Sequence, residues 1–210
     1  MGLAFTVLAA VVAQAAAAPP LIAPQFRLEA DPPAWRELAA RFARRTDTTA
    51  SFEERRYFPF RKEPVVLVGD VRVSPVHGLS LHYTSPDERT MILDDHGLLV
   101  REASGQAAPL DPRAAAAVGP LRSILRFDFA ELAAGYELYG RRAGETWSLG
   151  LVPRDATLRR ALGDIFVEGE ADTVRRIELR RSAKQHIDIV MAAPQPAASF
   201  TPEERRRFFR

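Results

Sequence analysis

The stretch from Val65 to Val100 constrains the fold most, because it predicts four successive β-strands joined by turn sequences. The alternation is clearest over residues 78–86, where Leu79, Leu81 and Tyr83 share one face and polar side chains share the other. A period of two is typical of a half-buried antiparallel strand. We therefore expect an antiparallel sheet with one apolar face that must be covered.

The remainder of the chain predicts more strands and few helices. Trp35, Leu38 and Phe42 recur at helical spacing, and a capping box begins at Thr201. Further strands are expected at 48–60, 136–142, 145–152, 165–168, 174–181 and 185–191, and helices at 32–46, 112–134 with a break near 119–120, 155–162 and after 201. The expectation is a mostly β, α+β chain with about ten or eleven strands.

Helices are too few to cover a sheet of this size if it stays flat. A strongly twisted sheet with about ten strands tends to curl, split or close. Helices over a curled sheet leave either a filled core or an apolar cavity that binds a ligand. Periodicity alone does not distinguish these two outcomes.

The N-terminus predicts an export signal. Residues 1–18 are apolar and end in small residues, the pattern of a secretory signal. The run stops at Pro19, which makes it short for a membrane span of ~20 residues. We expect a signal peptide over 1–18 and one domain over 19–210.

Composition narrows the function classes. The chain has no Cys, which excludes disulfides, thiol catalysis, Cys-based zinc sites and a lipid-modified N-terminal Cys. The formal net charge is +2, with basic and acidic residues interleaved, which argues against nucleic acid as a partner.

Catalytic and metal-binding patterns are weak. His77 and His82 are five residues apart, which on a strand places them on opposite faces. Asp94, Asp95 and His96 precede Gly97 and read as turn formers, although a hydrolase that uses these three is an alternative. The sequence has neither a nucleophile elbow nor a Gly-rich phosphate loop. We predict a protein that is not an enzyme, with no cofactor and no metal site.

Several segments, in order, resemble the outer-membrane lipoprotein carrier family (LolA type), in one of its divergent branches. An amphipathic helix precedes Ala50-Ser51-Phe52, and Gly69-Asp70-Val71 follows. The segments GLSLHYTSP at 78–86, ILDDHGLLV at 92–100 and Phe-Thr-Pro at 200–202 also fit. The resemblance implies an unclosed antiparallel β-barrel with a helical lid over an apolar cavity.

The resemblance also implies a function. Family members carry lipoproteins across the periplasm from an inner-membrane donor to an outer-membrane acceptor, with the acyl chains in the cavity. In the carriers an Arg that commonly precedes a Pro forms a hydrogen bond with the lid. In this sequence that place falls at or beside Pro75, and Arg72 is close but out of register. A different lipid or a lipid-linked metabolite therefore remains an alternative cargo.

We expect a periplasmic monomer that carries an acylated cargo; the alternative is a periplasmic sensor that binds a protein partner through the same half-barrel. The expected cavity wall comprises Leu79, Leu81, Tyr83, Leu93, Trp147, Leu149 and Leu151, and the expected lid residues are Ile124, Leu125, Phe127 and Phe129. Ordinary core packing explains the same residues equally well.

Overall fold

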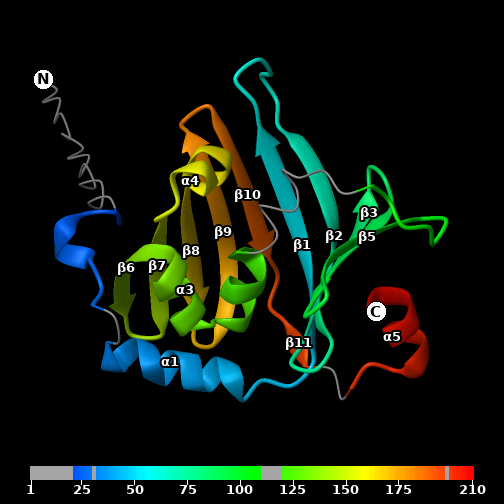
Figure 1. Cartoon of the computed structure of the whole chain (residues 1–210), viewed down its shortest axis with the longest axis horizontal. Coiled ribbons are helices and arrows are strands. Elements are labelled where there is room, and N and C mark those ends of the chain that lie inside the picture. Colours follow the sequence, from blue (N-terminus) through cyan, green and yellow to red (C-terminus); the bar gives the residue numbers. More distant parts are fainter. Residues whose placement is uncertain (1–20, 30–31, 110–119, 197–198) are drawn as a thin grey trace, which may run out of the picture.

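The protein is built around one curved antiparallel sheet (Figure 1). The computed structural model describes residues 21–29, 32–109, 120–196 and 199–210. The strands are β1 (Thr48–Tyr57), β2 (Val65–Ser74), β3 (Gly78–Ser85), β4 (Arg89–Asp94), β5 (Gly97–Glu102), β6 (Tyr136–Ala143), β7 (Thr146–Pro153), β8 (Asp164–Glu170), β9 (Thr173–Ser182), β10 (Gln185–Met191) and β11 (Gln195–Pro196).

The sheet is not closed. Its order is β5-β4-β3-β2-β1-β10-β9-β8-β7-β6, and β11 pairs with the start of β1. The edge strands β5 and β6 do not pair with each other in the described part of the chain. The expected mostly β fold, an unclosed antiparallel half-barrel, is confirmed.

The helices cover the sheet on two sides and at one end. In Figure 1, α1 (Pro33–Ala43) crosses the lower end, while the helical residues 120–126 and α3 (Phe129–Gly135) lie in front of the sheet. The remaining helices are α4 (Ala156–Leu162) and α5 (Pro202–Phe208), and a short 3-10 turn spans Pro24–Phe26. The expected helix start at Asp111 lies outside the described residues.

The C-terminal helix covers the convex face of β3, which sequence alternation had assigned to solvent. Ser80 is fully buried, and the His82 ring lies 5.2 Å from the Phe208 ring. Phe200, Phe208 and Phe209 form a second, smaller hydrophobic cluster there. The prediction of a half-buried strand was wrong for most of β3, because α5 returns from the end of the chain to cover it.

The main core lies between the concave face of the sheet and the helices. It joins side chains from α1, residues 120–132 and both halves of the sheet in a single buried cluster. Among the described residues, no helix has the length and hydropathy needed to cross a membrane.

Candidate functional site: an apolar groove beside the lid

A groove of about 520 Å³ opens where α1, residues 125–130 and the adjoining ends of β1 and β2 meet. This volume lies within the ~300–1,000 Å³ typical of sites for small organic ligands. Its lining is mostly apolar and includes Ala39, Phe42, Val73, Leu125, Phe127 and Phe129, with Arg45, Arg126 and Asp128 among the polar residues.

Helix α1 supplies one wall. It begins at Pro33, and Pro is well placed at a first helical position because no backbone N–H is needed there. Its buried stripe is Trp35, Leu38 and Phe42, which fixes the rotation of the helix on the sheet. This rotation leaves the small side chains of Ala39 and Ala43 facing the groove.

Five aromatic side chains form a continuous cluster: Trp35, Phe42, Phe127, Phe129 and Trp147. Three of them, Phe42, Phe127 and Phe129, line the groove. Phe127 is central. Its ring stacks on Phe42 with centroids 4.6 Å apart and meets Trp147 edge-on at 5.2 Å. The cluster ties residues 120–135, here called the lid segment, to α1 and to β7. Its three groove-lining rings give the groove a rigid apolar base.

The sharp bend at Phe127 comes from a helix-ending motif. The Phe127 N–H donates to the Ile124 carbonyl at 3.1 Å and the Asp128 N–H donates to the Ser123 carbonyl at 2.8 Å. This is the Schellman pattern, in which glycine usually occupies the left-handed position. Here Phe127 adopts φ 52°. Its packing therefore offsets a backbone strain of roughly 1–3 kcal/mol.

Asp128 then starts the next helix. Its carboxylate accepts a hydrogen bond from the Glu131 N–H at 3.1 Å, which caps α3. The segment from 120 to 135 is thus two helices joined at one strained residue that carries a groove-lining ring.

Two glycines make room for the tryptophans. A Cβ at Gly140 would lie 2.4 Å from Cζ2 of Trp35, and a Cβ at Gly169 would lie 2.0 Å from Cζ2 of Trp147. The Trp147 indole also donates to the Ala171 carbonyl at 2.9 Å, which fixes its orientation. The aromatic cluster therefore depends on strand residues that line no part of the groove.

The groove carries more positive than negative charge at its edge. Burial lowers the pKa of Arg45, an effect that the nearby Asp172 partly offsets. Arg45 Nη1 donates to the Asp172 carbonyl at 3.1 Å, and its guanidinium lies 5.6 Å from the Phe42 ring. Arg126 is exposed and has no hydrogen-bond or ion-pair partner among the described residues.

A buried polar contact lies elsewhere on the concave wall. The Tyr83 hydroxyl donates to the Glu54 carboxylate at 2.7 Å, and Arg56 donates to the other oxygen of that carboxylate. Burial, together with the negative charge of Glu54, raises the pKa of Tyr83. Tyr83 thus satisfies a carboxylate that is only 3% exposed.

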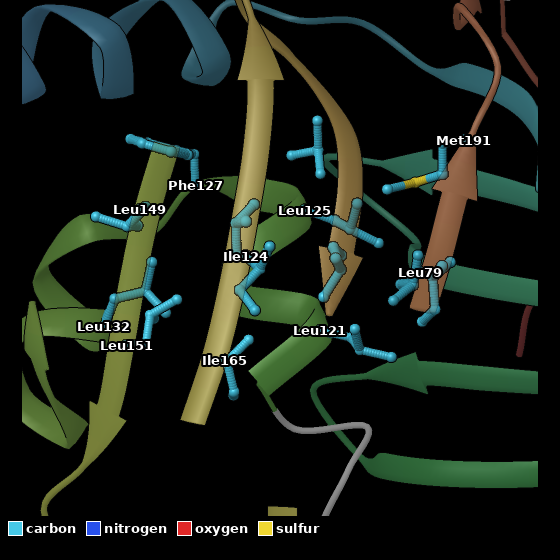
Figure 2. Close-up of a cluster of buried hydrophobic side chains, with 14 of the residues drawn as sticks. Leu79, Leu121, Ile124, Leu125, Phe127, Leu132, Leu149, Leu151, Ile165 and Met191 are labelled. Carbon is cyan, nitrogen blue, oxygen red and sulfur yellow. The ribbon is translucent and has the colours of Figure 1, made fainter. Parts of the chain in front are cut away.

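All eleven residues expected at the cavity wall and lid are buried, and all belong to one hydrophobic cluster. Figure 2 shows Ile124 against the strands that carry Leu149, Leu151 and Ile165, and Leu125 on the side nearer to Met191. Side chains of the lid helix, residues 120–126, thus fill the space under the sheet. Of the eleven, Leu125, Phe127 and Phe129 also line the groove.

The groove residues of α1 and the β1 and β2 ends were not among the predicted site residues. Ala39 and Phe42 share the apolar face of the predicted helix. The sequence therefore predicted the helix, but it did not predict that this helix also lines a groove. The small size of Ala39 and Ala43 is the one signal in the sequence for an unfilled wall.

The histidines and the turn acids lie away from the groove. His82 contacts Phe208 of α5, and His77 contacts Phe209, the residue that follows α5. His77 sits in the β2–β3 turn, so the alternation of faces along a strand does not apply to it. Asp94 accepts from the His96 N–H at 2.8 Å, as expected of a turn former. Within the described ranges no three His, Asp or Glu side chains are grouped to hold a metal.

Comparison with known proteins finds one matching family and several solved structures of low sequence identity. A LolA superfamily protein from Nitrosomonas europaea is 10% identical with a TM-score of 0.42, over 82% of this chain and 95% of that one. A chain of the Pseudomonas aeruginosa MucA/MucB complex is 15% identical with a TM-score of 0.46, over 81% of this chain and 59% of that one.

No curated protein matches the chain significantly. The family described as outer membrane lipoprotein carrier protein LolA-like matches residues 34–208, which include all of α1 but its first residue, the lid segment and every strand of the described sheet. The chain therefore belongs to the LolA-like family.

Proposed function

We propose that this protein is a non-enzymatic periplasmic carrier that shelters the acyl chains of a lipoprotein or another lipid-linked cargo. The observation that carries the proposal is the apolar groove with its aromatic base, set beside the lid helix. Family membership agrees with this use of the fold.

Acyl burial supplies the binding energy. Each CH₂ group removed from water contributes ~0.8 kcal/mol. A chain seated in the groove would contact Phe42, Phe127 and Phe129 while its polar end stays at the open side near Arg126. Transfer then requires only an acceptor that buries the same chain more favourably, with no chemical step.

Longer or multiple acyl chains need more room than the groove provides. The lid helix presents Leu121, Ile124 and Leu125 to the concave face of the sheet, and each is nearly fully buried. Displacing the lid helix would exchange these side chains for hydrocarbon of similar polarity. Such an exchange costs little transfer free energy, so lid movement can enlarge the site.

The proposed route begins with export by residues 1–18. The mature domain, 19–210, then receives cargo from an inner-membrane donor protein and passes it to an outer-membrane acceptor. The protein acts as a monomer in this scheme.

The test is acyl binding to the exported, purified protein. We expect native mass spectrometry and solvent extraction to recover lipid, and a delipidated sample to bind long-chain fatty acid saturably. Ala43→Phe, at an exposed groove position, should weaken binding by about tenfold or more, because the ring fills space that several CH₂ groups would occupy.

Ala34→Phe is the matched control, since Ala34 is exposed on the same helix and does not line the groove. Its affinity should equal that of the wild type. A protein that neither carries nor takes up lipid would contradict the proposal. Recovery of one stoichiometric partner protein without lipid would favour a partner-binding module instead.

A further inference from the structure

The tip of the β1–β2 hairpin, residues 58–63, carries an aromatic pair in which Phe60 is exposed and Phe58 is half-buried. Phe60 is 82% exposed, and its ring stacks on Phe58 at 5.5 Å. Figure 1 shows this hairpin extending past the rest of the sheet, at the end opposite α1. The two rings do not belong to either hydrophobic cluster of the protein.

Cations lie beside this pair in the same turn and around the neighbouring β9–β10 turn. Arg61 and Lys62 follow Phe60 in the same turn, and both are exposed. Arg181, near the end of β9, and Lys184, in the β9–β10 turn, are exposed as well. The strands bring the turns together.

Pairing of β1 with β10 places Tyr57 opposite His186, and their rings stack at 4.1 Å. None of the four cations forms an ion pair or hydrogen bond through its side chain with another residue that the structure describes. Glu63 is the one carboxylate among residues 58–63 and 181–185.

The shape of this end favours a bilayer over a protein partner. A stable protein interface buries ~800 Å² on each side, which calls for a broad complementary face. A narrow convex tip with two rings offers much less area. Exposed aromatic side chains beside unpaired cations are instead the combination that binds the boundary of anionic lipid membranes.

We propose that the hairpin tip and the β9–β10 turn dock on the surface of an anionic bilayer. Phe60 enters the headgroup region with Phe58 beside it, and Arg61, Lys62, Arg181 and Lys184 contact anionic headgroups. The groove lies at the other end of β1 and β2, next to Thr48 and Pro75. Docking therefore leaves the groove facing away from the bilayer, and this contact does not depend on cargo.

The test is flotation of the protein with vesicles of phosphatidylcholine, with and without phosphatidylglycerol. We expect binding to vesicles that contain phosphatidylglycerol, reduced by high salt because the contact is partly electrostatic. Phe60→Ser should lower the partition coefficient by about tenfold. Arg61→Gln combined with Lys62→Gln should lower it by a similar factor on anionic vesicles only.

Val76→Ser is the matched control. Val76 is also 82% exposed, but it lies at the β2–β3 turn, at the far end of β2. It should bind vesicles as the wild type does. Because these side chains are exposed, thermal unfolding should be unchanged in every variant, which separates lost binding from lost folding.

Three results would overturn the proposal: no binding of the wild type to anionic vesicles, equal binding of Phe60→Ser and wild type, or equal loss in Val76→Ser. A protein partner captured through Phe60 by a chain that does not float with vesicles would overturn it as well. Ala43→Phe should float normally, so failure here and failure of the carrier proposal are distinguishable.

Discussion

At the scale of single residues, the aromatic cluster beside the groove depends on two strand positions that have no side chain. Gly140 and Gly169 leave space that the rings of Trp35 and Trp147 occupy. Phe127 keeps a strained backbone because its ring completes the same cluster. The groove is thus shaped by strand positions and by one bend in the lid segment, in addition to its lining.

Gly169→Ala tests this dependence. The new Cβ would lie 2.0 Å from the Trp147 ring, so the indole must move, and we expect a loss of about 1–3 kcal/mol in the free energy of unfolding. Gly135→Ala meets nothing within 4 Å and should be neutral or slightly stabilising. Urea unfolding followed by tryptophan fluorescence measures both. Equal stabilities of the two variants would show that Trp147 does not need this space.

Buried tyrosines predict a loss of stability in alkali. Burial and the charge of Glu131 raise the pKa of Tyr136 to about 12, above the ~10 of an unfolded chain. Between these values the unfolded tyrosine loses its proton and the folded one keeps it. Stability is therefore fully present below pH ~10 and falls as pH rises toward 12, by up to about 2–3 kcal/mol from this residue.

Tyr136→Phe should flatten that decline. The side chain keeps its volume and loses the titrating hydroxyl, while Glu131 keeps its 2.7 Å bond from Ser123. Chemical unfolding of both proteins on either side of pH ~10 measures the difference. An identical decline in wild type and variant would mean that Tyr136 ionises alike in the folded and unfolded states.

At the scale of elements, α5 contributes more than its seven residues suggest. A capping box starts it, because the Thr201 hydroxyl accepts from the Glu204 N–H while the Glu204 carboxylate accepts from the Thr201 N–H. The helix packs Phe208 against His82 and places the Arg72 guanidinium 3.5 Å from the Phe208 ring. It therefore closes the convex face of β2 and β3.

Removing one ring from this cluster should be costly. Phe209 is 1% exposed and contacts Phe200 at 5.1 Å. We expect Phe209→Ala to lower the free energy of unfolding by about 3–5 kcal/mol. Phe60→Ala deletes the same ring from an exposed site and should change stability little. Similar unfolding midpoints for both would place α5 outside the cooperative fold.

Elements with a strong local pattern were predictable from the sequence. Alternation placed the strands from Val65 to Val100 and the face shared by Trp147, Leu149 and Leu151. The capping box at Thr201 gave α5 its start. Strand ends were less accurate, since β1 ends at Tyr57 and the expected strand ran to 60.

What could not be predicted depends on contacts between distant segments. The convex face of β3 looked exposed because its cover lies more than a hundred residues away, in α5. The groove was missed for the same reason. Its lining joins Ala39, Val73 and Phe127, and no local period relates residues from three separate elements.

At the scale of the whole molecule, the two ends of the β1–β2 hairpin have different chemistry. The end near Thr48 and Pro75 borders the apolar groove, and the end near Phe60 carries one exposed ring and several exposed cations. Strand length keeps these ends apart, since a strand rises ~3.3 Å per residue. Under the two proposals made above, the protein would approach a membrane with the Phe60 end while the groove faces away from the bilayer.

The two tryptophans of the chain provide the most direct test of acyl binding, since both belong to the aromatic cluster. The measurement is tryptophan fluorescence during titration with a fatty acid brominated on its chain, compared with the unbrominated acid. We predict saturable quenching by the brominated acid alone, retained in Ala34→Phe and strongly reduced in Ala43→Phe. Absence of quenching in the wild type, or equal quenching in Ala43→Phe, would contradict the claim that this groove holds hydrocarbon chains.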